Sequence, residues 1–101
     1  MNIDIVNNIK AIELIKIEIL QNVTNMFGDI ISEPVDGMFD TIVCDAANVI
    51  SLTYLLCRRL GLEYKTVNEK IKFEINKNIE NQHNLERKFG DLSKLLEDLE
   101  F

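Results

Sequence analysis

The stretch "DAANVISLTYLLCRRLG", residues 45–61, is the part of the sequence that most constrains the fold. Apolar side chains would cover most of the circumference of a helix built from it, and a helix that is apolar all round is buried all round. Gly61 suits the left-handed position just after a helix, while Arg58 and Arg59 favour the negative end of the helix dipole. We therefore predict a buried helix from about Met38 to Leu60.

A stripe of polar residues interrupts this apolar helix. Its members recur at spacings of three and four, so they line one side of the helix: Thr41, Asp45, Asn48 and Ser51. Burying a carboxylate without a partner costs several kcal/mol, so Asp45 requires a cation, hydrogen bonds or water. For a lone Asp–Asn pair, a solvated face or an internal hydrogen-bond network is favoured over a functional site.

The segments before this helix predict a long helix and a loop. Apolar side chains recur at helical spacing through residues 3–31, and this spacing outweighs the weak strand preference of the β-branched residues. Asn2 is a candidate N-cap. Pro34 and Gly37 in "SEPVDG", residues 32–37, disfavour a continuing helix.

The C-terminal part predicts two further helices. Thr66 and Glu69 have the spacing of a capping box, which predicts a helix from about Val67 to Ile79. A last helix is expected from about Leu85 to Leu99, interrupted at Gly90, where Asp91 could cap a restart.

The fold class is therefore predicted to be all-α, a bundle of four to five helices in one domain over residues 1–101. A chain of this size buries roughly two thirds of the surface that its unfolded form exposes. The other helices can hardly enclose the apolar second helix. We expect a second copy of the chain to complete the core, as a homodimer or a tetramer.

Composition argues against several classes of function. The formal net charge of −6 and the pI of about 4.7 disfavour nucleic-acid binding. Cys44 and Cys57 lie 13 residues apart on one predicted helix, too far for a disulfide, and are expected to be buried free thiols in a reducing cytosol. No signal-peptide pattern and no apolar run of about 18 residues is seen, so we expect a cytoplasmic protein without a membrane partner.

The first helix offers a polar face that could meet the stripe. Oxygen-bearing side chains share one side of it: Glu18, Gln21, Asn22, Asn25 and Asp29. Taken alone, this is an ordinary solvated face. Placed against Asp45 and Asn48, it would form an oxygen-rich cleft of the kind that hard cations favour, although Mg²⁺ prefers carboxylates to neutral amides.

The sequence resembles a known family at these residues. "DAANVISLTYLLCRRLGLEYKTVNEKIKFEINKN" looks like the MazG-type all-α nucleoside-triphosphate pyrophosphohydrolases. With "NIKAIELIKIEIL" and "HNLERKFGDLSKLLEDL", it resembles more closely the short MazG-like family, from about Asn8 to Leu99. The resemblance implies a helical bundle completed by dimerisation or tetramerisation. It also implies Mg²⁺-dependent hydrolysis of a nucleoside triphosphate to the monophosphate and pyrophosphate.

The resemblance also assigns candidate site residues. In active members one helix carries Glu-Glu-x-x-Glu and the next carries Glu-x-x-Asp, and these carboxylates hold Mg²⁺. When Gly61 is aligned with the family's helix-ending glycine, Asp45 and Asn48 fall on Glu-x-x-Asp. The residues that fall on Glu-Glu-x-x-Glu are Gln21, Asn22 and Asn25, and those that resemble the nucleotide contacts are Lys70 and Asn76.

The sequence departs from the family pattern at the metal ligands. Five carboxylates become one, Asp45, and four amides, with Glu18 as the only obvious substitute ligand. Mg²⁺ relies on anionic ligands, so it should bind weakly if at all. Two interpretations follow. The chain is a pyrophosphohydrolase with a degenerate metal site, or it is a non-catalytic module on the same scaffold that binds a nucleotide or a protein.

Overall fold

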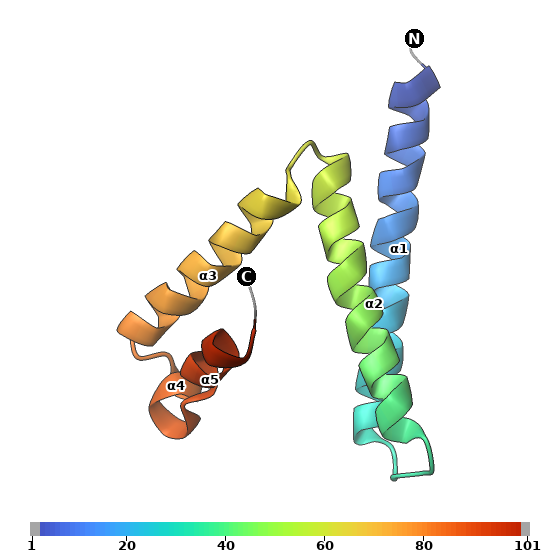
Figure 1. The fold of residues 1–101 in the computed structure, drawn as a ribbon. Coiled ribbons are helices and arrows are strands. Elements are labelled where there is room, and N and C mark those ends of the chain that lie inside the picture. Colours follow the sequence, from blue (N-terminus) through green and yellow to red (C-terminus); the bar gives the residue numbers. More distant parts are fainter. Residues whose placement is uncertain (1–2, 100–101) are drawn as a thin grey trace. The chain divides into compact units, whose positions relative to one another are not determined.

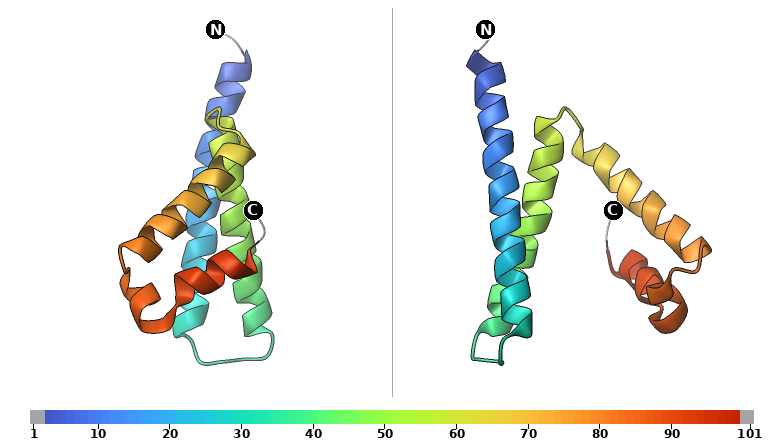
Figure 2. Two further views of the ribbon diagram at one scale, coloured as in Figure 1. Left: turned by 60° about the vertical axis from the view of Figure 1, so that its left-hand side comes forward. Right: turned by 180° about the vertical axis from the view of Figure 1, so that it is seen from behind.

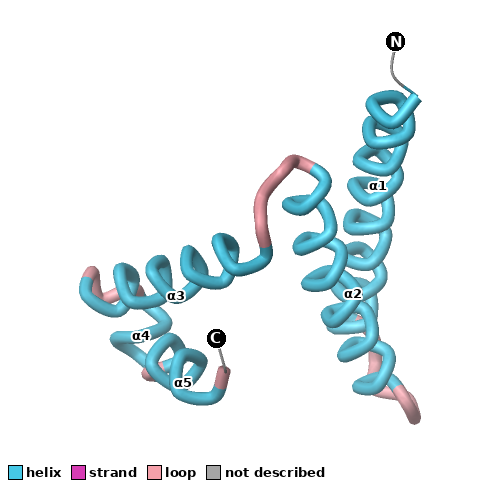
Figure 3. The backbone as a smooth tube through the Cα atoms, turned by 45° about the horizontal axis from the view of Figure 1, so that its top comes forward, coloured by secondary structure: helices cyan, strands magenta, loops and turns pink. Residues whose placement is uncertain are grey.

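The computed structural model describes residues 3–99, and this range contains five α-helices and no strand. Figure 1 shows the helices and Figure 3 the loops that join them. The prediction of an all-α fold is confirmed. The helices are α1 (Ile3–Ile31), α2 (Met38–Arg59), α3 (Tyr64–Glu80), α4 (Asn84–Phe89) and α5 (Asp91–Asp98).

The first two helices form an antiparallel hairpin, visible in Figures 1 and 2. The loop that joins them ends at Gly37, whose φ of 80° is a left-handed conformation suited to glycine. At the other end of the hairpin, Asn8 Nδ2 of α1 donates a hydrogen bond to the Arg59 carbonyl, 3.1 Å away. Between these ends, Ile15 of α1 is buried with 9% of its surface exposed.

The end of α2 is built as the sequence predicts. Gly61 has a φ of +89°, and its N–H donates to the Arg58 carbonyl at 3.0 Å. The next N–H, of Leu62, reaches back to the Cys57 carbonyl at 2.9 Å. These two bonds make a Schellman motif, which satisfies carbonyls that the helix end would leave unpaired.

The predicted start of α3 is wrong by about one turn. The helix begins at Tyr64, after Glu63, which has an extended backbone and makes no side-chain capping bond. Thr66 therefore lies inside the first turn and is not the N-cap. The Schellman motif closes at Leu62, so the chain re-enters a helix after a single extended residue. Asn2, the predicted cap of α1, lies outside the described residues.

At the C-terminal end, two helices form where one interrupted helix was predicted. Gly90 separates them with a φ of +69°. The carboxylate of Glu86 in α4 accepts hydrogen bonds from the Ser93 N–H at 2.8 Å and from the Ser93 hydroxyl at 2.5 Å. Glu86 thus stabilises the start of α5, a role that the sequence had suggested for Asp91. His83 caps α4 by accepting a bond from the Leu85 N–H at 3.1 Å.

The chain divides after Leu62 into two compact units. The first consists of α1 and α2. In the second, α3 packs against α5, and Ile75 of α3 is its buried apolar residue, 7% exposed. The expectation that residues 1–101 form one domain stays a prediction.

Within the single chain α2 is largely exposed, and the expectation that a second copy of the chain completes its burial stays a prediction. Asp45 is its only buried residue. Phe39 and Val43 are 75% and 66% exposed. Cys44 and Cys57 are free thiols as expected, but Cys44 is exposed rather than buried.

The second helix also bears on the expected absence of a membrane span. By length and composition alone, α2 is long and apolar enough to cross a bilayer, although little of it is buried inside the structure. The sequence-based statement that no segment reaches this length was therefore too strict. A core helix that is covered by protein meets the same criterion. The expected cytoplasmic location stays a prediction.

Candidate functional site

The α1–α2 hairpin has two chemically different sides. A helix turns by about 100° per residue, so residues three and four apart share a side. A hydrogen bond of 3.3 Å from Asn48 Nδ2 to Asn22 Oδ1 joins the polar stripes of the two helices on one side of their contact line. We call this the polar side. Its residues are Glu18, Asn22 and Asp29 of α1 with Thr41, Asp45 and Asn48 of α2.

Asp45 is the buried charge of the polar side. Its side chain is 9% exposed, and its Oδ2 atom is buried without a hydrogen-bond partner. A carboxylate in this position is costly to desolvate, so it gains from any donor or cation that reaches it. This unpartnered oxygen is the feature of the polar side that points most directly to a ligand.

The two asparagines of the polar side are already engaged with their surroundings. Asn22 Nδ2 donates to the Glu18 carbonyl at 2.8 Å, and Asn22 Oδ1 accepts the bond from Asn48. Asn48 Nδ2 also lies 3.9 Å from Cys44 Sγ. The side-chain oxygen of Asn22, which is the only atom of this amide that could ligate a metal, therefore already accepts one hydrogen bond from the neighbouring amide.

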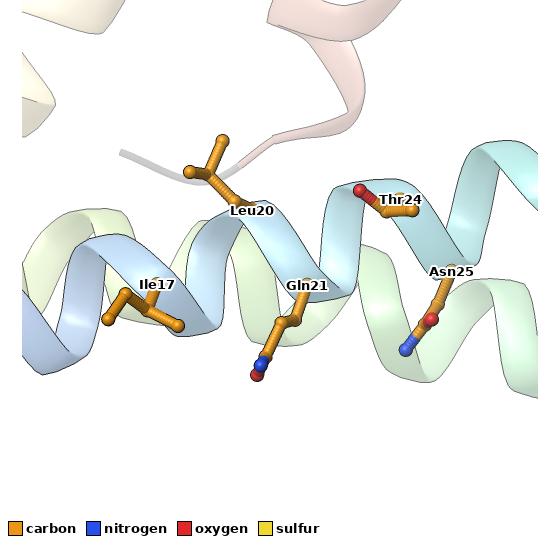
Figure 4. Close-up of a pocket in the computed structure, with 5 residues that line it drawn as sticks. All are labelled: Ile17, Leu20, Gln21, Thr24 and Asn25. Atoms are coloured by element: carbon orange, nitrogen blue, oxygen red, sulfur yellow. The ribbon is translucent and has the colours of Figure 1, made fainter.

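Gln21 and Asn25 lie apart from this pair. Both are exposed, and both line an open surface hollow of about 490 Å³ on the face of α1 that points away from α2, shown in Figure 4. Among the residues that the structure describes, the remaining lining residues are Ile17, Leu20 and Thr24, all on α1. The structure does not bring Gln21 and Asn25 against Asp45.

Glu18 is half-buried on the polar side but is displaced from Asp45 along the helices. It lies four residues before Asn22, and Asp45 lies three residues before Asn48, in helices that run in opposite directions. The rise per residue then separates the two carboxylates by about 10 Å along the axes. Side chains lean toward the N-terminus of their own helix, so these two lean away from each other. Glu18 is poorly placed to replace a ligand beside Asp45.

The two residues predicted to contact nucleotide lie on α3, in the second compact unit. Lys70 Nζ is 3.6 Å from Glu74 Oε1 and 4.4 Å from the centre of the Phe73 ring. Asn76 Nδ2 donates to the Lys72 carbonyl at 3.1 Å. Both side chains are exposed and held by neighbours on their own helix.

The donors of the polar side do not suit Mg²⁺. Among residues 3–99, no three His, Cys, Asp or Glu side chains are arranged to hold a metal ion. The nearest further oxygen ligands to Asp45 on the polar side are the neutral amides of Asn22 and Asn48, and Mg²⁺ depends on anionic oxygen ligands. We therefore derive no chemical step from a metal at this position.

Comparison with known proteins identifies the scaffold. No curated protein and no solved structure matches significantly. Residues 5–92 match the sequence profile of the MazG-like family. This match covers most of the sequence, including both helices of the polar side. The chain belongs to the MazG-like family.

Proposed function

We propose that this protein is a non-catalytic MazG-like module that binds a nucleoside triphosphate without hydrolysing it efficiently. The observation that carries the proposal is the hydrogen bond between Asn22 and Asn48. In the family pattern these two positions carry metal-binding carboxylates. Here their side chains are hydrogen-bonded to each other, and Asp45 is the buried acid beside them.

The amides also change which ligands the polar side can accept. Carboxylates repel the phosphates of a nucleotide unless a cation lies between them, whereas an amide N–H donates a hydrogen bond to a phosphate oxygen. Amides in place of acids at Asn22 and Asn48 therefore reduce both the need for a metal and the means to bind one. Nucleotide binding that does not depend on Mg²⁺ is the behaviour that this chemistry supports.

A second candidate is a Mg²⁺-dependent pyrophosphohydrolase with a weakened metal site. The buried Oδ2 atom of Asp45, which lacks a partner, favours this function because a cation would compensate its charge. Such an enzyme would require metal ligands beyond Asp45, because Glu18 lies about 10 Å away from Asp45 along the helix axes.

Pyrophosphate release from a panel of nucleoside triphosphates with Mg²⁺ distinguishes the two candidates. We expect no turnover by the natural chain. A restored variant, with Gln21→Glu, Asn22→Glu, Asn25→Glu and Asn48→Asp, should gain Mg²⁺-dependent turnover, because it regains the acids of the family pattern and two of them, at Asn22 and Asn48, lie beside Asp45.

A matched control adds the same charge elsewhere on the hairpin. Its four changes are at exposed positions outside the family pattern: Asn7→Glu, Thr24→Glu, Ser32→Asp and Thr53→Asp. It should stay inactive. Rapid turnover by the natural chain would contradict the non-catalytic proposal and support the hydrolase.

A further inference from the structure

His83 is the only histidine of the chain, and it lies at the corner between α3 and α4 (Figure 3). Its imidazole Nδ1 atom accepts a hydrogen bond from the Leu85 N–H, 3.1 Å away. An atom that accepts an N–H needs a free lone pair, so this ring is neutral and carries its proton on Nε2. Protonation would turn Nδ1 into a donor and would break the N-cap of α4.

The backbone of His83 joins the same two helices. At the end of α3, the His83 N–H donates to the Asn78 carbonyl at 3.0 Å, and the Gln82 N–H donates to the Ile79 carbonyl at 3.1 Å. At the start of α4, the His83 carbonyl accepts from the Arg87 N–H at 2.9 Å. The last turn of α3 and the first turn of α4 therefore both depend on one residue.

The corner contains an unfavourable backbone conformation. Gln82 has a φ of +53°, and among the residues that the structure describes it is the only one other than glycine with a positive φ. This left-handed conformation is disfavoured for a residue that has a Cβ atom. The hydrogen bonds of His83 offset that cost, so loss of the cap leaves the strain at Gln82 less well compensated.

The short helix after the corner connects it to α5. A helix of six residues such as α4 is not stable by itself and depends on its caps and its packing. The Glu86 carboxylate of α4 accepts two hydrogen bonds from Ser93 and so supports the start of α5. Loss of α4 would remove this support from α5, whose Leu92 and Leu96 are partly buried.

Charged residues of three helices lie around the corner. They are Lys77 and Glu80 of α3, Glu86, Arg87 and Lys88 of α4, and Asp91 and Lys94 of α5. None of the ion pairs within residues 3–99 includes His83. Arg87 is engaged with the side chain of Asn84 at 2.8 Å. The positive end of the α4 dipole disfavours a charged imidazole at this position, so the dipole and the cap both favour the neutral ring.

We propose that the α3–α4 corner is a pH-sensitive switch, closed when His83 is neutral and open when His83 is protonated. Histidine is the side chain that ordinarily changes its charge between about pH 5 and pH 8. The stabilisation from the cap is present above this range and is lost as the pH falls through it. The switch lies in the second compact unit and does not depend on nucleotide binding at the α1–α2 hairpin.

Nuclear magnetic resonance of the full chain tests the switch, because a single histidine gives one set of imidazole signals. At pH 7.5 we expect the tautomer that carries its proton on Nε2. Between pH 7.5 and pH 5.5, the protection of the Leu85 amide against hydrogen exchange, corrected for the intrinsic rate, should fall about fivefold, as expected for a lost N-cap. The protection of Ile15 in α1 should stay constant within about twofold.

His83→Asn is the matched control, because asparagine is among the best N-cap residues and does not titrate. In this variant the protection of Leu85 should agree at the two pH values within about twofold. His83→Ala should show weak protection at both, and the comparison with His83→Asn suffices if the alanine variant does not fold. An equal change in the natural chain and in His83→Asn, no change in the natural chain, or a proton on Nδ1 at pH 7.5 would overturn the proposal.

Discussion

The polar and apolar sides of the α1–α2 hairpin are built from the same two helices and differ completely in chemistry. On the polar side, two amides bind each other beside the buried Asp45. On the opposite, apolar side, large apolar side chains that include Phe27 and Val43 are exposed. The contact line between the helices separates the two sides, with Ile15 buried along it. The comparison shows how one two-helix unit can carry two faces of opposite polarity.

The largest expected effect on stability is at the contact line between α1 and α2, which separates the two sides. Ile15→Ala should lower the free energy of unfolding by about 2–4 kcal/mol, because it leaves a cavity between α1 and α2. The neighbouring Leu14, 58% exposed, is the control, and Leu14→Ala should cost less than about 1 kcal/mol. Urea denaturation measures both. Equal losses would mean that Ile15 does not lie in a packed seam.

A smaller effect, of opposite sign, is expected at the centre of the polar side. Asp45→Asn keeps the shape of the side chain and removes a buried charge without a partner, so it should raise the free energy of unfolding by about 1 kcal/mol. The same denaturation experiment, without divalent cations, measures the change. A marked loss of stability would show that the carboxylate has a compensating partner, and would weaken the contrast between the two sides.

The smallest expected effect concerns the amide pair. Asn22→Ala removes two hydrogen bonds, to Asn48 and to the Glu18 carbonyl, and the exposed 3.3 Å bond to Asn48 should by itself contribute about 0.5 kcal/mol. A double-mutant cycle with Asn48→Ala isolates the interaction between the two side chains. The exposed Asn25 is the control, and Asn25→Ala should change stability by less than about 0.5 kcal/mol. A coupling energy of zero would show that the side chains of Asn22 and Asn48 do not interact.

The helices could be predicted from sequence because their signals are local. Pro34 and Gly37 mark the loop before α2, and Gly61 marks its end, so the predicted bounds of α1 and α2 agree with the structure to within a residue. The start of α3 was missed because Thr66 matches a capping box, whereas the turn at Gly61 and Leu62 starts the helix earlier.

The arrangement of the polar residues could be predicted only in part. Periodicity shows which residues share a broad face of α1, and Asn22 does meet Asn48. It does not show where on that face the contact with α2 is centred. Gln21 and Asn25 are turned far enough from Asn22 that they lie on the outer surface. The exposure of Val43 and Ile50 likewise depends on which other segments pack against α2. Local patterns in the sequence do not determine that packing.

Titration calorimetry with a non-hydrolysable nucleoside triphosphate, with Mg²⁺ and with a chelator, tests the central claim most directly. The account predicts that the triphosphate binds in both conditions, with dissociation constants that agree within about threefold, because amides and not metal-bound carboxylates meet the phosphates. Binding that appears only with Mg²⁺, and that Asp45→Asn abolishes, would contradict it.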